Sequence, residues 1–264
     1  MLSSRIGNRK REIVLQERDK HLLRELSLMR VIDREQARVV AEFPSIMLVN
    51  RRLLSLTRAG LLKRFFIGTP AGGKKALYSL STLGANLVQV PCTGPRRRAN
   101  EAVTVDFFVY HQLGINSIYC ALKYRPIPLA DTRLVRWESF SRPIDSQLSL
   151  KPDAYFEIQS LQKTVGTFLE FDLGHENLSI WKAKVQKYLR YAVSGEFERT
   201  FRQPQFRVLV VTNSDRRREA LRKATAAITD KIFWFTIADS IYHQGFWSPI
   251  WSRAPGNHEP TSLL

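Results

Sequence analysis

Apolar residues recur at helical spacing near the start of the chain. Between residues 18 and 29, Leu22, Leu23, Leu26 and Met29 fall on one side of an amphipathic helix. Asp33, followed three residues later by Gln36, forms a capping-box pattern. The pattern therefore predicts two helices within the first forty residues, the second of which begins after Asp33.

A third helix and a hairpin follow. Pro44 and Ser45 mark the start of a helix that ends at Ala59-Gly60. Strand-like runs at 61–67 and 76–80 then flank a glycine-rich turn at 68–75. Three helices followed by a hairpin with a basic tip predict a winged helix-turn-helix domain over residues 15–90.

In such a domain the third helix enters the major groove of DNA and the hairpin reaches phosphates. The polar candidates on these two elements are Asn50, Arg51, Arg52, Ser55, Arg58, Lys74 and Lys75. Arg51 and Arg52 are adjacent, so they point about 100° apart and at most one of them reads a base. A protein-interaction module with the same three helices and hairpin is the alternative.

The pattern changes after a basic linker at residues 91–100, where Arg96, Arg97 and Arg98 can follow phosphates or simply be solvated. Helices are expected at 103–122, 180–192 and 215–228, and strands at 134–140, 154–158, 165–171, 206–212 and 232–236. This order predicts a mixed α/β domain with a central sheet over residues 101–251, and a tail over 252–264. The whole chain is therefore expected to be an α/β protein, α+β overall.

Carboxylates gather on two neighbouring strands of that domain. Asp153 begins one strand, and Glu170 and Asp172 end the next, two residues apart and so on the same side. At one sheet edge they would repel one another unless a cation lay between them, and Mg²⁺ or Mn²⁺ is suited to such oxygen ligands. The chemistry that this predicts is hydrolysis or transfer of a phosphodiester. Each carboxylate taken alone can instead be structural, Asp153 as a turn cap and the others in ion pairs with Lys184 or Arg190.

The helix expected at 180–192 carries Lys184 and Tyr188, which lie four residues apart on one face that can point to the carboxylates. Lys182 and Lys187 are alternatives to Lys184. Covalent attack by Tyr188 or Tyr191 is a further alternative. Without such a role, both tyrosines would be packing residues of the helix.

The order Pro152-Asp153, Glu170-Phe171-Asp172 and then a helix with Lys184 and Tyr188 resembles a variant of the PD-(D/E)xK nuclease core, with Asp172 where that core has lysine. Together with the N-terminal winged helix and His111 in the intervening helix, the chain resembles the replication-relaxation family, which includes MobC-type conjugative relaxases. The resemblance implies a metal-dependent, strand-specific nick at a plasmid transfer origin. It also implies Asp153, Glu170 and Asp172 as metal ligands and Lys184 as the catalytic lysine. His111 could support the site by orienting a carboxylate or a phosphate, and a half-buried structural histidine is the alternative.

Charge and composition sharpen this picture. The 264 residues hold 41 Lys and Arg against 24 Asp and Glu, a net charge of +17, and most of the excess falls in the first hundred residues. Such an excess favours a nucleic-acid partner over simple solubility. Arg216, Arg217 and Arg218 form a second basic group that can clamp DNA or be solvated. The late aromatic residues are expected in the core, although one of them could stack on an unpaired base: Phe233, Trp234, Phe235, Phe246, Trp247 and Trp251.

Two cysteines and five scattered histidines argue against a zinc finger, a disulfide framework and the two-histidine metal box of common relaxases. No signal peptide or membrane span is evident, so a cytoplasmic protein is expected. The main hypothesis is a nickase that acts on double-stranded plasmid DNA, holds single-stranded DNA after nicking and works with an accessory or coupling protein. The alternatives are a non-catalytic DNA-binding regulator of replication or transcription with a degenerate nuclease core, and a dimeric double-strand endonuclease.

Overall fold

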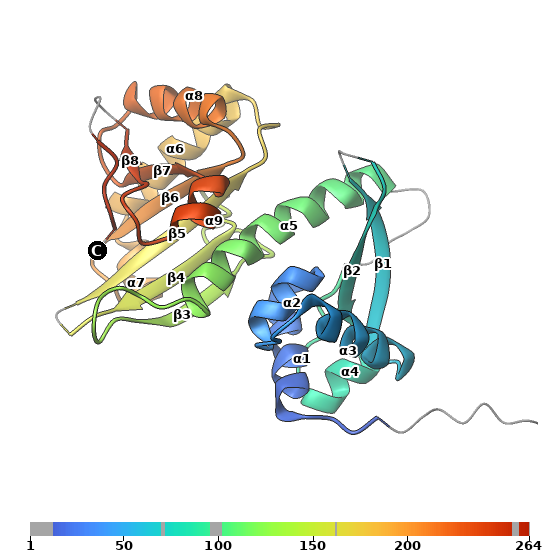
Figure 1. Ribbon diagram of the computed structural model, residues 1–264. Coiled ribbons are helices and arrows are strands. Elements are labelled where there is room, and N and C mark those ends of the chain that lie inside the picture. Colours follow the sequence, from blue (N-terminus) through green and yellow to red (C-terminus); the bar gives the residue numbers. More distant parts are fainter. Residues whose placement is uncertain (1–12, 70–71, 96–101, 162, 255–258, 264) are drawn as a thin grey trace, which may run out of the picture. The chain divides into compact units, whose positions relative to one another are not determined.

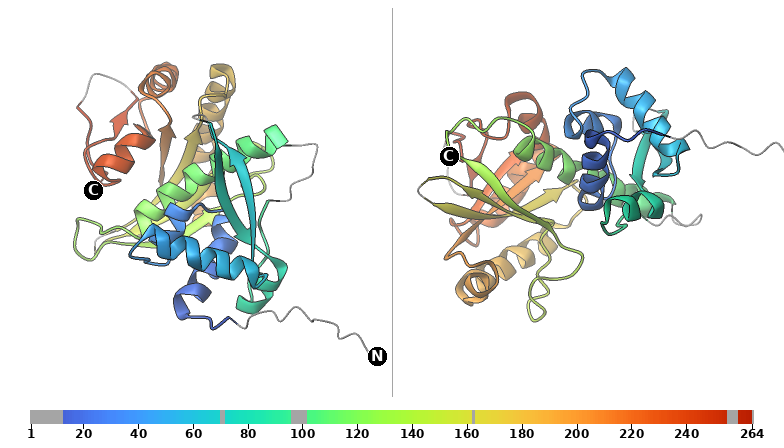
Figure 2. Two further views of the ribbon diagram at one scale, coloured as in Figure 1. Left: turned by 45° about the vertical axis from the view of Figure 1, so that its right-hand side comes forward. Right: turned by 90° about the horizontal axis from the view of Figure 1, so that it is seen from below.

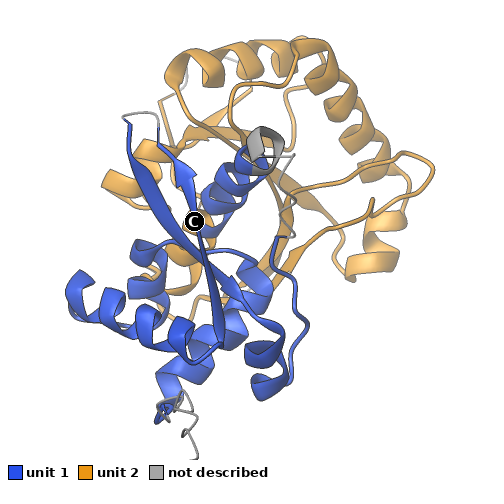
Figure 3. Ribbon diagram, turned by 90° about the vertical axis from the view of Figure 1, so that its right-hand side faces the viewer, with its two compact units in different colours: residues 1–116 blue, residues 117–264 orange. Residues whose placement is uncertain are grey.

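The computed structural model describes residues 13–69, 72–95, 102–161, 163–254 and 259–263. Two compact units divide the chain, Met1–Asn116 and Ser117–Leu264 (Figure 3). The division falls inside a helix, because the first half of that helix packs in the first unit. Arg96, Arg97 and Arg98 lie outside the described residues, as does the whole second half of the expected linker at 91–100. No helix in the described part of the chain is long and apolar enough to cross a membrane.

The first unit begins with three helices, α1 (Glu17–Met29), α2 (Arg34–Val40) and α3 (Ile46–Arg58) (Figure 1). Asp33 caps α2 by accepting a hydrogen bond from the Gln36 backbone N–H, and Ser45 caps α3 by accepting one from Leu48. The apolar face expected from the spacing in α1 is fully buried at Leu22, Leu23 and Leu26. The positions of these three helices in the sequence were therefore predicted correctly.

An antiparallel hairpin follows, made of β1 (Leu62–Gly68) and β2 (Lys74–Leu80). After it comes α4 (Thr82–Val88), a short helix that the apolar spacing did not indicate, and then the long α5 (Ala102–Lys123). Val109 and Leu113 of α5 pack against Ile67 and Leu77 of the hairpin. The first half of α5 therefore completes the core of the first unit.

An ion pair fixes α3 against α1. The Asp19 carboxylate is fully buried and accepts hydrogen bonds from the Arg52 guanidinium at both oxygens, and Arg52 also donates to the Val14 carbonyl. This hydrogen bond to Asp19 raises the pKa of Arg52, against the opposing effect of burial. Arg52 is therefore occupied within the unit, whereas its neighbour Arg51 is exposed.

The second unit is built on a six-stranded mixed sheet in the order β3-β4-β5-β6-β7-β8. Its strands are β3 (Arg133–Ser139), β4 (Ala154–Gln159), β5 (Thr164–Asp172), β6 (Phe206–Thr212), β7 (Phe233–Ile237) and β8 (Ser252–Arg253). The β5, β6 and β7 strands are parallel and the other pairs are antiparallel. The mixed α/β domain expected from the alternation of elements is confirmed.

Helices cover both faces of this sheet (Figures 1 and 2). On one face, α6 (Leu178–Val193), α7 (Glu196–Phe201) and α8 (Asp215–Ala226) bury an aromatic cluster that includes Tyr155, Phe168 and Trp181. On the other face, Phe156 of β4 stacks with Trp137 of β3, which contacts Tyr119 of α5. The short helix α9 (Ala238–Gln244) follows β7 directly. Both faces of β5 are consequently buried from Gly166 to Asp172.

The C-terminal segment differs from the expected tail at 252–264. Ser252 and Arg253 pair with β7, and Trp251 forms a bridge with Thr261. The late aromatic residues explain why this segment packs on the second unit. Phe235, Phe246 and Trp251 are buried, and their apolar surface must be shielded from water. The expectation of core aromatics is confirmed for Phe233, Phe235, Phe246, Trp247 and Trp251, whereas Trp234 is partly exposed. The described residues up to Thr261 do not form the expected tail.

Replacing Arg52 should destabilise the first unit strongly. Arg52→Ala leaves the buried Asp19 charge without its partner, so we expect a loss of about 3 kcal/mol in the free energy of unfolding. The matched control is Arg51→Ala, whose side chain is exposed and whose loss should cost at most about 0.5 kcal/mol. Urea unfolding of the full chain followed by circular dichroism measures both, and equal midpoints for the two variants would refute the structural role of Arg52.

Candidate functional site

The predicted carboxylates lie at the end of β5 and the start of β4. Glu170 and Asp172 project from the same face of β5, as the alternation of strand residues requires. That face is not an open sheet edge, because α6 and α8 pack over it. Glu170 is only 2% exposed and Asp172 only 8% exposed. The predicted carboxylates of β5 therefore lie beneath two helices, at the end of a central strand.

Lys184 of α6 reaches the Glu170 carboxylate. Its Nζ lies 2.5 Å from Oε2 of Glu170, and its side chain is 23% exposed. The hydroxyl of Tyr188, one turn further along α6, donates to Oε1 of Glu170 at 2.5 Å. The lysine and tyrosine that the sequence placed on one helix face therefore hold the two oxygens of one carboxylate.

Asp153 joins this group from the neighbouring strand. Its Oδ2 accepts a hydrogen bond from the Phe171 backbone N–H at 2.8 Å, and its own N–H donates to the Leu169 carbonyl. Asp153 is partly exposed, and its negative charge raises the pKa values of both Glu170 and Lys184. We call Asp153, Glu170, Lys184 and Tyr188 the carboxylate cluster.

Burial sets the electrostatics of the carboxylate cluster. Burial raises the pKa of Glu170 to about 7, although the Lys184 charge pulls it down. Burial disfavours the ammonium of Lys184, but the Glu170 and Asp153 charges outweigh it and raise the Lys184 pKa above its ordinary value. Burial and the Glu170 charge also raise the pKa of Tyr188. Lys184 therefore stays charged at neutral pH, and Tyr188 stays protonated.

Asp172 belongs to a different contact. The Arg217 guanidinium of α8 donates to both Asp172 oxygens, at 3.1 and 2.6 Å, and also to the Glu176 carbonyl. The Gly174 backbone N–H donates to Asp172 as well. The structure therefore brings Asp153 and Glu170 together and ties Asp172 to a basic residue that the sequence suggested for DNA.

The contacts of the carboxylate cluster do not include the remaining candidates. Lys182 is exposed, and Lys187 donates to the Ser149 carbonyl at 3.4 Å. His111 lies on the part of α5 that belongs to the first unit. Tyr191 is fully buried, and burial raises its pKa. A buried, protonated tyrosine is poorly placed for covalent attack on a DNA phosphate in this conformation, and this holds for Tyr188 as well.

The basic group of α8 is largely paired within the chain. Arg217 binds Asp172, and Arg218 forms ion pairs with Asp215 and Glu219. Arg216 is exposed. The pairing removes most of the free positive charge that the sequence suggested for this helix.

The DNA candidates of the first unit divide into exposed and paired residues. Asn50, Arg51 and Arg58 are exposed on α3, and Lys74 is exposed on β2. Lys75 forms an ion pair of 2.5 Å with Asp33, and Arg52 is held by Asp19. Of the adjacent arginines, Arg51 is thus the one available to a ligand.

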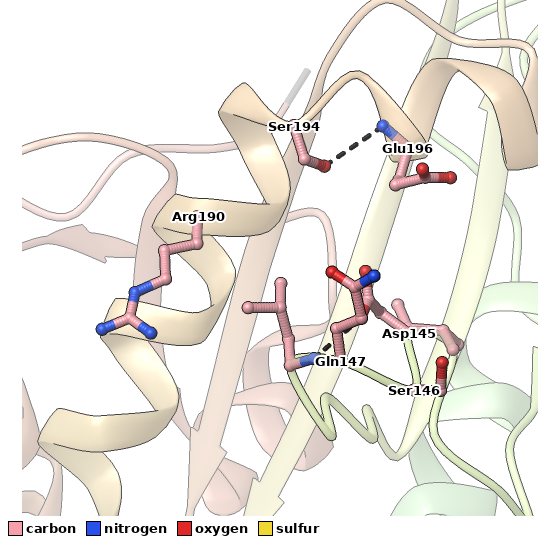
Figure 4. Close-up of a pocket in the computed structure, with 8 residues that line it drawn as sticks. Asp145, Ser146, Gln147, Arg190, Ser194 and Glu196 are labelled. Carbon is pink, nitrogen blue, oxygen red and sulfur yellow. Dashed lines mark hydrogen bonds between the residues drawn. The ribbon is translucent and has the colours of Figure 1, made fainter.

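A cavity of about 510 Å³ lies at the other end of α6 (Figure 4). Its lining includes Arg190, Ser194 and Glu196 from α6, α7 and their connection, and Asp145 from the loop before β4. The sequence suggested Lys184 or Arg190 as ion-pair partners for Glu170 and Asp172. The structure pairs Glu170 with Lys184, whereas Arg190 lines this cavity.

Over the described residues, no three His, Cys, Asp or Glu side chains come together in a way that could hold a metal ion. A two-carboxylate set is nevertheless sufficient for Mg²⁺, which commonly binds one or two carboxylates and keeps several waters or substrate oxygens. Asp153 and Glu170 fit that description by their chemistry, and Asp153 and Lys184 are partly exposed.

Comparison with known proteins identifies the class. The family model described as replication-relaxation matches residues 23–203, which include most of the first unit, the carboxylate cluster and α6. The chain therefore belongs to the replication-relaxation family. No curated protein and no solved structure matches the chain.

The Glu170 pKa makes stability depend on pH in a defined window. Since the pKa is about 7 in the folded chain against an ordinary value of 4.5, the folded state holds a proton that the unfolded state has lost between these pH values. The free energy of unfolding therefore falls as the pH rises through this window, and Glu170→Gln removes this dependence. We expect the difference in the free energy of unfolding between Glu170→Gln and the wild type to shift in favour of the variant between about pH 5 and about pH 8. Denaturant unfolding at the two pH values measures this difference. A difference that stays constant with pH would contradict the raised pKa.

Proposed function

We propose that the protein is a metal-dependent nickase of the MobC relaxase type, which cuts one strand of plasmid DNA at a transfer origin. The observation that carries the proposal is the carboxylate cluster, in which two carboxylates from neighbouring strands share a charged lysine from the following helix. This arrangement has the chemistry of a variant PD-(D/E)xK site, and it occurs in a family concerned with replication and relaxation of DNA. A cytoplasmic location, where plasmid DNA is found, belongs to the same proposal.

In this proposal Asp153 and Glu170 hold Mg²⁺ or Mn²⁺. When bound, such an ion lowers the pKa of a water molecule and stabilises negative charge on the leaving oxygen. Lys184 keeps its positive charge beside the two carboxylates and binds the phosphate that is to be cut. Tyr188 orients the Glu170 carboxylate through its hydrogen bond, and the Asp172–Arg217 pair positions the end of β5 against α8.

The first unit supplies binding. Its three helices and hairpin have the order of a winged helix, so α3 would lie in the major groove with Asn50, Arg51 and Arg58 toward the DNA. Lys74 would contact phosphate from the hairpin. Arg52 and Lys75, which pair with acids of the unit, would support the shape of this surface and leave DNA contact to their exposed neighbours.

A binding protein without catalysis is the second candidate. It is favoured by the fact that both Glu170 oxygens already accept hydrogen bonds from Lys184 and Tyr188, while Arg217 occupies both oxygens of Asp172. A degenerate nuclease core would retain such acids for stability, because their hydrogen-bond partners lie within the chain. Such a protein would regulate replication or transcription by binding DNA through its first unit.

Cleavage of supercoiled plasmid separates the two candidates. A plasmid that carries a candidate transfer origin is incubated with the protein and Mg²⁺ or Mn²⁺, and the products are resolved as supercoiled, nicked or linear DNA. We expect nicked circles from the wild type, and a rate lower by about a hundredfold or more for Asp153→Asn and Glu170→Gln. Glu196→Gln, which changes a carboxylate outside the cluster, is the matched control and should nick normally.

Three results would overturn the nickase. Absence of cleavage with either metal, with DNA binding intact, would support the regulator. Equal nicking by the wild type and both cluster variants would remove the carboxylate cluster from the reaction. Linear DNA as the first product would indicate a double-strand endonuclease.

A further inference from the structure

The helix α6 carries positive charge and no negative charge of its own. Its 16 residues include four basic ones and no acidic one. In α8, by contrast, Arg218 and Arg222 pair with acids of the same helix. The basic residues of α6 therefore need other elements, or a ligand, as partners of opposite charge.

Three of these four residues form a row along α6. Lys184, Lys187 and Arg190 are spaced three residues apart, and residues at that spacing are neighbours on a helix surface, with Cβ atoms about 5–6 Å apart. Lys184 belongs to the carboxylate cluster, so the row begins at the candidate site. The fourth residue, Lys182, lies about 160° around the helix from Lys184 and is not part of the row.

The members of the row differ in their partners. The Nζ atom of Lys184 lies 2.5 Å from the Glu170 carboxylate. Lys187 donates to the Ser149 carbonyl at 3.4 Å, and its ammonium keeps two further N–H donors. Arg190 is exposed, and among the residues that the structure describes it has no ion pair and no hydrogen bond. Unpaired positive charge therefore increases along the row, away from the carboxylate cluster.

The row ends at the cavity of about 510 Å³, because Arg190 is part of its lining (Figure 4). Ser146 and Gln147 of the same lining add a hydroxyl and a side-chain amide, both of which can donate to phosphate oxygens. Cavities of about 300–1,000 Å³ are the usual size of ligand sites. The end of the row thus combines a cation, neutral donors and space for a ligand.

Two acids also line the cavity, and both have partners within the chain. Asp145 accepts a hydrogen bond from the Leu148 backbone N–H at 2.7 Å. Glu196 pairs with Arg199, which lies one turn further along α7. Neither carboxylate pairs with Arg190, so its guanidinium is available to an anion.

We propose that Lys187 and Arg190 form a phosphate track, along which the DNA strand next to the cut runs from the carboxylate cluster to this cavity. The inference rests on the proposed function, in which Lys184 binds the phosphate that is to be cut. From Lys184 to Arg190 the helix rises about 9 Å, and a DNA strand rises about 3.4 Å per nucleotide. The row therefore covers roughly two to three nucleotides. Its contacts are to phosphates, so the phosphate track positions the strand without reading its sequence.

The test is the salt dependence of duplex binding by the full chain, measured by fluorescence anisotropy in EDTA with a labelled duplex. Each phosphate contact contributes about 0.9 to the slope of log affinity against log salt concentration. The double variant Lys187→Gln, Arg190→Gln should therefore lower the magnitude of this slope by roughly two. Arg190→Lys keeps the charge and should keep the slope. Lys182→Gln removes an exposed lysine of the same helix outside the row, so it is the matched control and should bind as the wild type does.

An unchanged slope in the double variant overturns the phosphate track and leaves duplex binding to the first unit. An equal reduction in Lys182→Gln also overturns it, because the total charge of α6 would then matter and the position in the row would not. Circular dichroism of each variant checks that the fold is intact. EDTA removes metal-dependent cleavage from the assay, so the absence of nicking would contradict the proposed function without changing the expected slopes.

Discussion

The buried Glu170 carboxylate is the group around which the helix-covered face of the second unit is arranged. A carboxylate that is 2% exposed carries a large desolvation cost unless charged or polar partners meet it. Lys184 and Tyr188 meet its two oxygens from successive turns of α6, so this contact ties that helix to β5 of the sheet. The same partners that make burial tolerable also give the site its chemistry, a charged lysine beside two acids.

A second buried ion pair, Asp172–Arg217, also ties a helix to β5. Arg217 binds Asp172 through two hydrogen bonds and so links α8 to the end of β5. In the first unit, Arg52 and Asp19 link α3 to α1 in the same manner. In each case one residue of a basic cluster forms a buried ion pair, and its neighbour, Arg216 or Arg51, is exposed.

Local sequence patterns predicted most of the elements correctly. The caps at Asp33 and Ser45 and the alternation along β5 are short-range signals, and they located α2, α3 and the shared face of the two strand acids. The four-residue spacing of Lys184 and Tyr188 predicted their common side. The pairing of Asp172 with Arg217 joins residues 45 positions apart and has no local signal, so it could not be predicted. The cover of both sheet faces escaped prediction for the same reason, because it depends on where whole helices pack.

The central claim is that Asp153 and Glu170 hold a divalent cation. Titration of the full chain with Mn²⁺, followed by electron paramagnetic resonance, measures this directly and needs no origin sequence. The account predicts saturable binding by the wild type that is retained in Glu196→Gln and lost in Asp153→Asn and Glu170→Gln. Absence of saturable binding in the wild type, or equal binding by all four proteins, would contradict it.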